Sequence, residues 1–122
     1  MLFDTRYFWA VFTSRDQETT EGLRAIFESS KAASTSSITI YEVFRLTLAS
    51  EGRAVARLRT EMMRREFKVI DVDSKIAENG AEISHRLRVP MADALIMATA
   101  KKIGLPCVTD DPHFTEVKTV WV

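Results

Sequence analysis

Apolar residues along this chain occur as short continuous runs and as longer segments with helical spacing. The first run, Met1–Phe3, is followed directly by Asp4, and we predict that it forms a buried strand. Within the next apolar block, Tyr7–Phe12, Phe8 and Phe12 stand four residues apart, as on one face of a helix. We expect these two rings to contribute to the core or to a dimer contact rather than to bind a ligand.

The following segments predict a helix, a strand and a second helix. Apolar residues with helical spacing follow a capping segment and predict a helix over residues 16–30. We assign a strand to Ala32–Thr35. In the apolar segment Ile38–Leu48, β-branched residues favour a strand, whereas the length and the spacing of its apolar pairs favour a helix capped by Ser36 or Ser37. We predict the helix.

An amphipathic helix is predicted after Gly52. Its apolar positions are Val55, Leu58, Met62 and Met63. The opposite side is rich in arginine and offers a phosphate-facing stripe as one interpretation. Because Arg57, Glu61 and Arg65 are spaced four residues apart and can pair with one another, we favour a solvated face.

Three more elements complete the pattern outside the segment Val89–Pro106. Residues 67–72 alternate between apolar and polar and predict a strand. A helix follows Ser74, in which Gly80 permits a close crossing by another helix. Residues 117–121 alternate again and predict a last strand at the edge of the sheet.

The segment Val89–Pro106 is the most informative stretch of the chain. Pro90 suits a helix start and Gly104 suits a left-handed helix end, which predicts a helix over Met91–Ile103. This helix is apolar on nearly every side, so we expect it to be central and buried. It carries one carboxylate, Asp93, whose simplest role would be to complement the helix dipole, worth about 0.3 to 1 kcal/mol.

Strands that alternate with helices predict an α/β sandwich with a mostly parallel, roughly five-stranded sheet. At 122 residues the chain is the size of one domain, and we expect residues 1–122 to form it. A short buried strand is predicted at Leu105–Thr109. Acids then follow two strands and occupy early turns of two helices: Asp4, Asp110, Asp111, Glu42 and Asp93.

These acids are predicted to meet, because sites in open α/β sheets form outside the carboxyl ends of the strands. Like charges that lie so close repel unless a cation neutralises them, and oxygen ligands of this type suit Mg²⁺ or Mn²⁺. The two histidines, His85 and His113, have no zinc-like spacing with each other or with Cys107. A zinc site is therefore not predicted.

Composition limits the other classes of function. Seventeen basic residues balance seventeen acidic ones, so any site for a polyanion must be local. The chain has no apolar run of about 18 residues that would span a membrane, and it starts without a signal peptide, so we expect a cytoplasmic protein. Cys107 is the only cysteine, which excludes an internal disulfide, and its apolar surroundings predict a buried, inert thiol.

Four segments resemble the PIN-domain family, and within it the short single-domain toxin ribonucleases of the VapC type. In family order they are Asp4-Thr5, Ser37–Glu42 within SITIYEV, Pro90–Ala100 with PMADALIMATA, and Thr109–Phe114, TDDPHF. The resemblance implies a three-layer α/β/α sandwich. It also implies a metal and catalytic site formed by Asp4, Glu42, Asp93 and Asp111, supported by Thr109, Asp110 and Thr5.

The function implied by this resemblance is a metal-dependent endoribonuclease that hydrolyses RNA phosphodiester bonds. It would be the toxin of a toxin–antitoxin pair, with a cognate antitoxin as partner, and the apolar N-terminal block makes a homodimer plausible. The chain departs from the commonest family pattern at Arg6-Tyr7. Arg6 is expected at the mouth of the acid cluster, either as a counter-charge or as a clamp on an RNA phosphate, and we favour the clamp.

Two alternatives remain open at this point. A catalytically silent PIN-like module that only binds RNA or assembles with partners would keep the architecture and lose the chemistry. A receiver-like phospho-acceptor domain is also a small α/β fold with clustered acids and Mg²⁺. In a receiver domain an acidic pair should follow the first strand, whereas here the pair Asp110-Asp111 follows the fourth.

Overall fold

The structure, a computed structural model, describes residues 1–122 and contains one sheet of five short strands. The strand order is β3-β2-β1-β4-β5, and every neighbouring pair is parallel. The strands are β1 (Leu2–Phe3), β2 (Ser34–Ser36), β3 (Lys68–Ile70), β4 (Cys107–Val108) and β5 (Thr119–Val120). The predicted five-stranded parallel sheet is thus confirmed.

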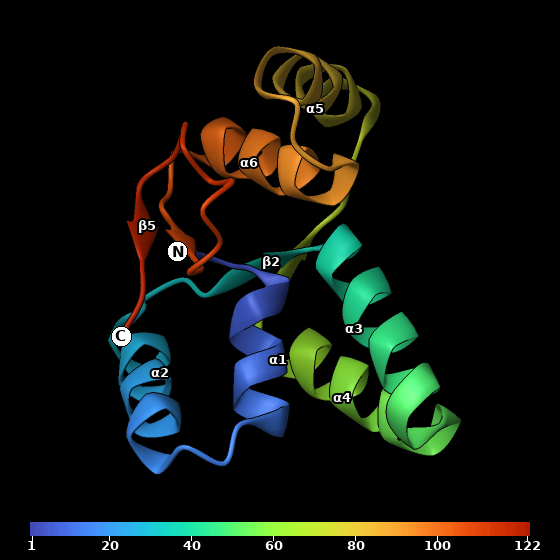
Figure 1. The fold of residues 1–122 in the computed structure, drawn as a ribbon, viewed down its shortest axis with the longest axis vertical. Helices are drawn as coiled ribbons and strands as arrows, with labels where there is room; N and C mark the ends of the chain where they lie inside the picture. The colour runs from blue at the N-terminus through green and yellow to red at the C-terminus, as the bar shows by residue number, and fades with distance from the viewer.

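Six helices cover the two faces of this sheet (Figure 1). They are α1 (Thr5–Thr13), α2 (Gln17–Ser29), α3 (Ser37–Glu51), α4 (Arg53–Glu66), α5 (Ser74–Leu87) and α6 (Met91–Ile103). In Figure 1, α5 and α6 lie together on one side of the strands, and α1 to α4 lie on the other. This is the three-layer α/β/α architecture that the sequence predicted. None of the six helices has the length and apolarity needed to cross a membrane.

The alternation of side chains along the strands divides the core into two clusters. Leu2 and Cys107 face α5 and α6, whereas the next residues along, Phe3 and Val108, face α1 to α4. Phe3 packs edge to face against Tyr7, with ring centroids 4.7 Å apart. Because each strand contributes so few residues, the helices supply most of both clusters.

Helix α6 is the buried centre of one layer, as predicted. Residues 94–100 are all buried, and Gly104 ends the helix in the left-handed region at φ 69°. Gly80 of α5 lies against it so closely that an added Cβ would stand 2.7 Å from Leu95 Cδ2. The close crossing predicted at Gly80 is therefore confirmed, and Cys107 is buried with its thiol pKa raised by burial to about 12, consistent with an inert thiol.

The apolar segment Ile38–Leu48, for which both a strand and a helix were considered, belongs to helix α3. The hydroxyl of its N-cap residue, Ser36, accepts a hydrogen bond from the Ile38 backbone N–H at 3.1 Å. The preceding strand begins two residues later and ends one residue later than we predicted, at Ser34–Ser36. Two of its small polar side chains are buried with hydrogen-bond partners: Ser36 caps α3, and Thr35 donates to the Phe3 carbonyl at 2.8 Å.

The predicted apolar face of α4 is wrong at one position. Leu58 is 56 % exposed, whereas its neighbour Arg59 is 9 % exposed. The Arg59 guanidinium pairs with Glu51, donates to the Thr47 hydroxyl at 3.2 Å and lies 5.1 Å from the centroid of the Phe12 ring. Arginine can be buried here because its charge and its planar face both have partners.

The order of the strands places a topological switch point beside β1. The chain moves outward from β1 to β2 and β3, then crosses through α5 and α6 to β4 on the other side of β1. The carboxyl ends of β1 and β4 therefore flank the reversal, which is where open α/β sheets bind their ligands.

Candidate functional site

Asp4 and Thr109 are joined at the carboxyl ends of β1 and β4. Asp4 follows β1 directly and is 2 % exposed. The Thr109 hydroxyl donates to Asp4 Oδ2 at 2.8 Å and accepts from the Asp111 backbone N–H at 3.1 Å. One threonine thus connects the acids that follow the two central strands.

Glu42 is held near Asp4 by the neighbouring residue Thr5. The Thr5 hydroxyl donates to Glu42 Oε1 at 2.6 Å, which ties the first residue of α1 to the second turn of α3. The Glu42 charge makes a small addition to the effect of burial, which is the main cause of the raised pKa of the Asp4 carboxyl. The structure therefore brings Thr5 and Glu42 to the same edge of the sheet as Asp4.

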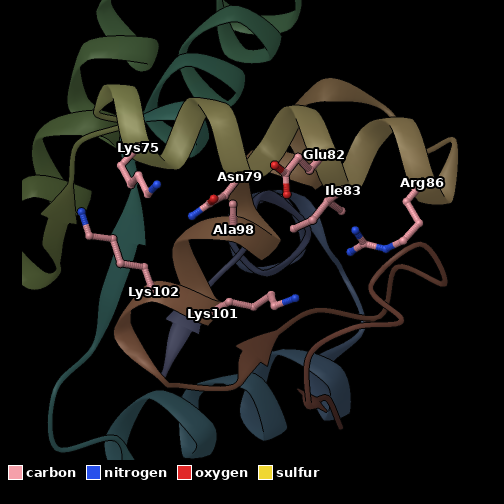
Figure 2. A pocket seen from close by; sticks show the side chains of 8 residues that line it. All are labelled: Lys75, Asn79, Glu82, Ile83, Arg86, Ala98, Lys101 and Lys102. Carbon is pink, nitrogen blue, oxygen red and sulfur yellow. The ribbon is translucent and has the colours of Figure 1, made fainter.

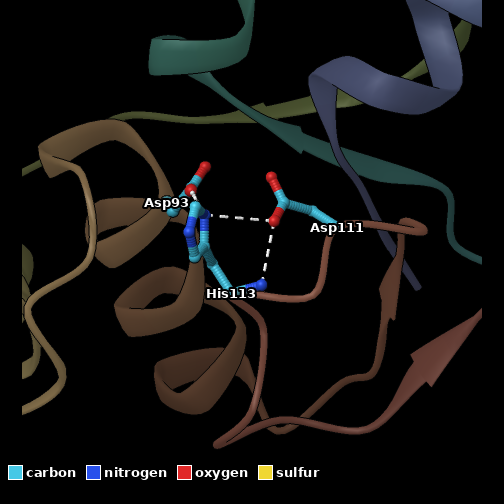
Figure 3. A group of neighbouring side chains, drawn as sticks. All are labelled: Asp93, Asp111 and His113. Carbon is cyan, nitrogen blue, oxygen red and sulfur yellow. Dashed lines mark hydrogen bonds and ion pairs between the residues drawn. The ribbon is translucent and has the colours of Figure 1, made fainter.

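Asp93, Asp111 and His113 form the densest group of potential ligands (Figure 3). One ligand atom from each residue lies within 4.8 Å of the others. His113 Nδ1 is 2.9 Å from Asp93 Oδ2 and 3.2 Å from Asp111 Oδ1. Asp93 is in the first turn of α6, and Asp111 and His113 lie in the loop after β4.

Sequence reasoning missed His113, because it looked only for zinc-like spacing between histidines and cysteine. The available signal was local. His113 follows Asp111 by two residues, and its backbone N–H donates to Asp111 Oδ1 at 2.9 Å in an Asx-type turn. Its nearness to Asp93, 20 residues earlier in the chain, depends on the fold.

Arg6 and Asp110 form an ion pair at the exposed rim of this site. Arg6 Nε is 2.8 Å from Asp110 Oδ1, and the two side chains are 55 % and 38 % exposed. The residues that the sequence singled out thus form separate contact groups at one end of the sheet: Thr5 with Glu42, Thr109 with Asp4 and Asp111, and Arg6 with Asp110. Asp110 is directed at Arg6 and stands apart from the group formed by Asp93, Asp111 and His113.

The acids of this cluster carry charge that the protein alone does not fully offset. Burial, together with the charges of Asp93 and Glu42, raises the pKa of Asp4 to about 7, although hydrogen bonds from Thr109 and Thr5 oppose the shift. Burial and the charge of Asp111 likewise raise the pKa of Asp93, against the opposing effect of His113. A cation would relieve both effects, so the carboxylates present fit a divalent metal ion.

The loop that carries Asp111 and His113 is anchored at its far end by Glu116. Arg86 of α5 donates through one terminal nitrogen to Glu116 Oε1 at 2.5 Å and Oε2 at 2.7 Å. Lys101 of α6 adds a contact to Glu116 Oε2 at 3.1 Å. Phe114 is 4 % exposed and packs into the core beside α6. These contacts fix the loop against both helices of that layer.

A separate cavity of about 490 Å³ lies between α5 and α6 (Figure 2). It is lined by Lys75, Asn79, Glu82, Ile83, Arg86, Ala98, Lys101 and Lys102. None of these residues belongs to the acid cluster. Arg86 and Lys101 share Glu116, and Lys102 pairs with Asp73, so three of the four cations around the cavity already have an acidic partner within the fold.

Comparison with known proteins gives one family and a consistent set of folds. The family model for the PIN domain matches residues 1–120. Mycobacterium tuberculosis VapC20, described as a sarcin-ricin loop cleaving toxin, superposes with a TM-score of 0.83 at 19 % identity, covering 99 % of this chain and 98 % of that chain.

Two further solved structures are similar to this chain. A toxin–antitoxin complex from Klebsiella pneumoniae has a TM-score of 0.77 at 24 % identity, covering 98 % of this chain and 94 % of that chain. DNA-bound VapBC from Salmonella typhimurium has a TM-score of 0.78 at 20 % identity, covering 98 % and 95 %. A search of curated protein sequences gives no match.

Proposed function

Since this chain belongs to the PIN domain family, we propose that residues 1–122 act as one nuclease domain that hydrolyses RNA phosphodiester bonds with a bound Mg²⁺ or Mn²⁺. The proposed metal and catalytic residues are Asp4, Glu42, Asp93 and Asp111. The observation that carries this proposal is the convergence of these carboxylates at the switch point of the sheet, with the pKa of both Asp4 and Asp93 raised.

The side chains around the acids have supporting roles in this proposal. Thr109 orients the Asp4 carboxylate, and Thr5 orients that of Glu42, so that each acid presents its remaining oxygen lone pairs to the site. Asp110 holds Arg6 at the rim, where a guanidinium can meet a substrate phosphate. A bound divalent cation supplies Lewis acidity toward the phosphoryl group and makes a water molecule more acidic.

The proposed biological setting is a toxin–antitoxin pair. Similar folds occur in a sarcin-ricin loop cleaving toxin and in complexes described as toxin–antitoxin or VapBC. These descriptions belong to those proteins, and they support an RNA substrate and a cognate antitoxin as proposals for this one. The receiver-like alternative is not retained, because the family match extends over residues 1–120.

A homodimer also stays a proposal, and only part of the N-terminal apolar block is available for it. Tyr7 and Phe8 of the N-terminal apolar block are only 5 % and 2 % exposed, so they contribute to the core of one chain. Large exposed apolar side chains lie on α1, α3, α4, the start of α6 and the last residue: Val11, Tyr41, Leu48, Leu58, Met91 and Val122. Sedimentation of the wild-type protein and a Leu58→Glu variant measures whether such a surface joins two chains.

The test of the proposed function is cleavage of a generic single-stranded RNA with Mg²⁺ or Mn²⁺ present, and again after chelation. Asp93→Asn and Asp111→Asn should each abolish cleavage, because an amide keeps the shape of the carboxylate but loses the charge that holds the cation. Glu61→Gln is the matched control, since Glu61 is an exposed acid of α4 outside the cluster. Full cleavage by either Asp variant would contradict the proposal.

The catalytically silent alternative predicts a different result in the same assay. A binding or assembly module would retain RNA affinity in the wild-type protein, with no metal-dependent cleavage under any condition. Measuring affinity for the same RNA alongside cleavage separates the two proposals.

A further inference from the structure

His113 is the one nitrogen donor among the oxygen donors of the acid cluster. Its ring lies between Asp93 and Asp111, with Nδ1 facing one oxygen of each carboxylate (Figure 3). The side chain is 48 % exposed, so it is not needed to fill the core. Packing therefore does not explain why His113 Nδ1 lies close to both carboxylates.

The backbone holds the ring in this position. The N–H of His113 donates to Asp111 Oδ1 at 2.9 Å, which closes the turn that carries both residues. The next side chain, Phe114, is buried in the core, and Glu116 is bound by Arg86 and Lys101. The loop is thus anchored on both sides of His113, and the ring is presented by a supported backbone.

The separations between the donor atoms match those of neighbouring ligands on one ion. Two ligands at about 2.1 Å from a cation and at right angles to each other are roughly 3 Å apart in octahedral coordination. The Nδ1 distances to Asp93 Oδ2 and Asp111 Oδ1 are 2.9 Å and 3.2 Å. A small shift of these groups away from hydrogen-bond contact would let all three bind the same cation.

We propose that His113 Nδ1 is a direct ligand of the cation held by Asp93 and Asp111, and that this nitrogen makes the site select Mn²⁺ over Mg²⁺. Imidazole suits first-row transition metals, whereas Mg²⁺ prefers oxygen ligands and gives up its water reluctantly. Four carboxylates alone would give an all-oxygen site with little basis for this choice. The inference rests on the proposed metal site and deepens it by naming a fifth ligand.

The competing role for His113 is that of a counter-charge. A protonated imidazole would pair with Asp93 and Asp111 while no metal is present, and it would have to leave when a metal binds. In that case removing the ring should strengthen binding of both metals alike, and no nitrogen should couple to a bound Mn²⁺.

The chain offers a clean experiment because it contains only two histidines, His85 and His113. His85 is exposed in the last turn of α5, away from the cluster, so His85→Gln is the matched control for His113→Gln. Electron spin echo spectroscopy of Mn²⁺ bound to the full chain detects modulation by a coordinated ¹⁴N nucleus. We expect this modulation in the wild type and in His85→Gln, and its loss in His113→Gln.

A labelled protein makes the test independent of how well His113→Gln folds. In His85→Gln the only histidine is His113, so incorporation of ¹⁵N-histidine should replace the ¹⁴N modulation by that of ¹⁵N without any change at the site. Unaltered modulation after labelling, or its absence from every variant that binds Mn²⁺, would overturn the inference.

Calorimetry of metal binding tests the selectivity. His113→Gln should weaken Mn²⁺ binding by at least roughly tenfold to a hundredfold, since removing a group that only supports a metal ligand already costs that much. Binding of Mg²⁺ should change far less. Equal changes for the two ions would overturn the claim of selectivity.

The failure of this inference is distinguishable from the failure of the proposed function. If the wild-type chain bound neither ion, or if Asp93→Asn bound Mn²⁺ as tightly as the wild type, the proposed metal site itself would be wrong. If Mn²⁺ bound at Asp93 and Asp111 without nitrogen coupling, the metal site would stand and the role of His113 alone would be rejected.

Discussion

At the scale of single residues, the acids at this end of the sheet differ in how deeply they are buried, and burial changes their charge state. Asp4 is almost completely buried and its pKa is raised to about 7, whereas Asp110 is exposed and paired with Arg6. Two acids that each follow a central strand thus differ in burial and in their partners. Burial, and to a smaller extent the nearby acids, disfavours the charge of Asp4, which a cation could stabilise, whereas Asp110 pairs with Arg6 at the rim.

The raised pKa of Asp4 predicts how metal-free stability depends on pH. Between about pH 4 and pH 7 the unfolded chain loses the Asp4 proton while the folded chain keeps it. The free energy of unfolding should therefore fall as pH rises through this window, by at most roughly 4 kcal/mol, since each pH unit between the two pKa values costs about 1.36 kcal/mol. Above about pH 7 this loss should be complete.

Asp4→Asn removes the titration and should leave a protein that is more stable than the wild type at pH 8 and similar to it near pH 4, in chelated buffer. Urea unfolding across this pH range measures the difference. Asp71→Asn, at an exposed position outside the cluster, is the control and should follow the wild-type curve. An Asp4→Asn curve parallel to that of the wild type at all pH values would refute the assignment of the buried charge.

Arg6 is predicted to clamp an RNA phosphate. It contacts Asp110 through Nε, which leaves both terminal amino groups free for a phosphate. Arg6→Ala, in an Asp93→Asn background that cannot cleave, should lower the slope of log affinity against log salt by about 0.7 to 1, the share of one contact. Arg57→Ala, on the exposed side of α4, should leave the slope unchanged. A slope unaffected by loss of Arg6 would identify it as a counter-charge only.

At the scale of elements, Arg59 joins three helices. Its guanidinium reaches Thr47 and Glu51 of α3 from α4, and it lies over the rings of Trp9 and Phe12 of α1. Because α3 also carries Glu42, this contact fixes the helix that brings one acid to the site. Arg59 is a positioning residue for α3, at the end opposite to Glu42.

Arg59→Met should lower the free energy of unfolding by roughly 1.5 to 3 kcal/mol, the cost of losing a partly buried hydrogen bond to a charged group. Arg57→Met, two residues earlier on the solvated face, should change it by less than about 0.5 kcal/mol. Guanidinium unfolding monitored by tryptophan fluorescence compares the two. Equal effects would mean that the ring and carboxylate contacts of Arg59 contribute nothing specific.

At the scale of the whole molecule, local sequence signals predicted most of the helices and strands. Details that depend on contacts between residues far apart in the sequence were not predicted. Pro90 and Gly104 set the ends of α6 through backbone preferences, which act within a few residues. The exact position of β2 depends instead on pairing with β1 and β3, which no local pattern encodes.

The same distinction applies to the site. The acids were predicted from strand ends and from the family resemblance, and the fold brings them to one edge of the sheet. His113 and Arg59 were missed because their roles come from partners on other elements, Asp93 of α6 and Glu51 of α3. A histidine in a turn and an arginine on an amphipathic helix look ordinary until the fold places them.

The parallel sheet without hairpins has a consequence for the timing of synthesis. The Thr109 hydroxyl that binds Asp4 is made 105 residues after it. The only neighbours of β1 are β2 and β4, so the nascent N-terminal strand has no local partner with which to close. Long-range pairing of this kind is slow to form. The group formed by Asp4, Thr109 and Asp111 therefore cannot assemble until translation has passed Asp111.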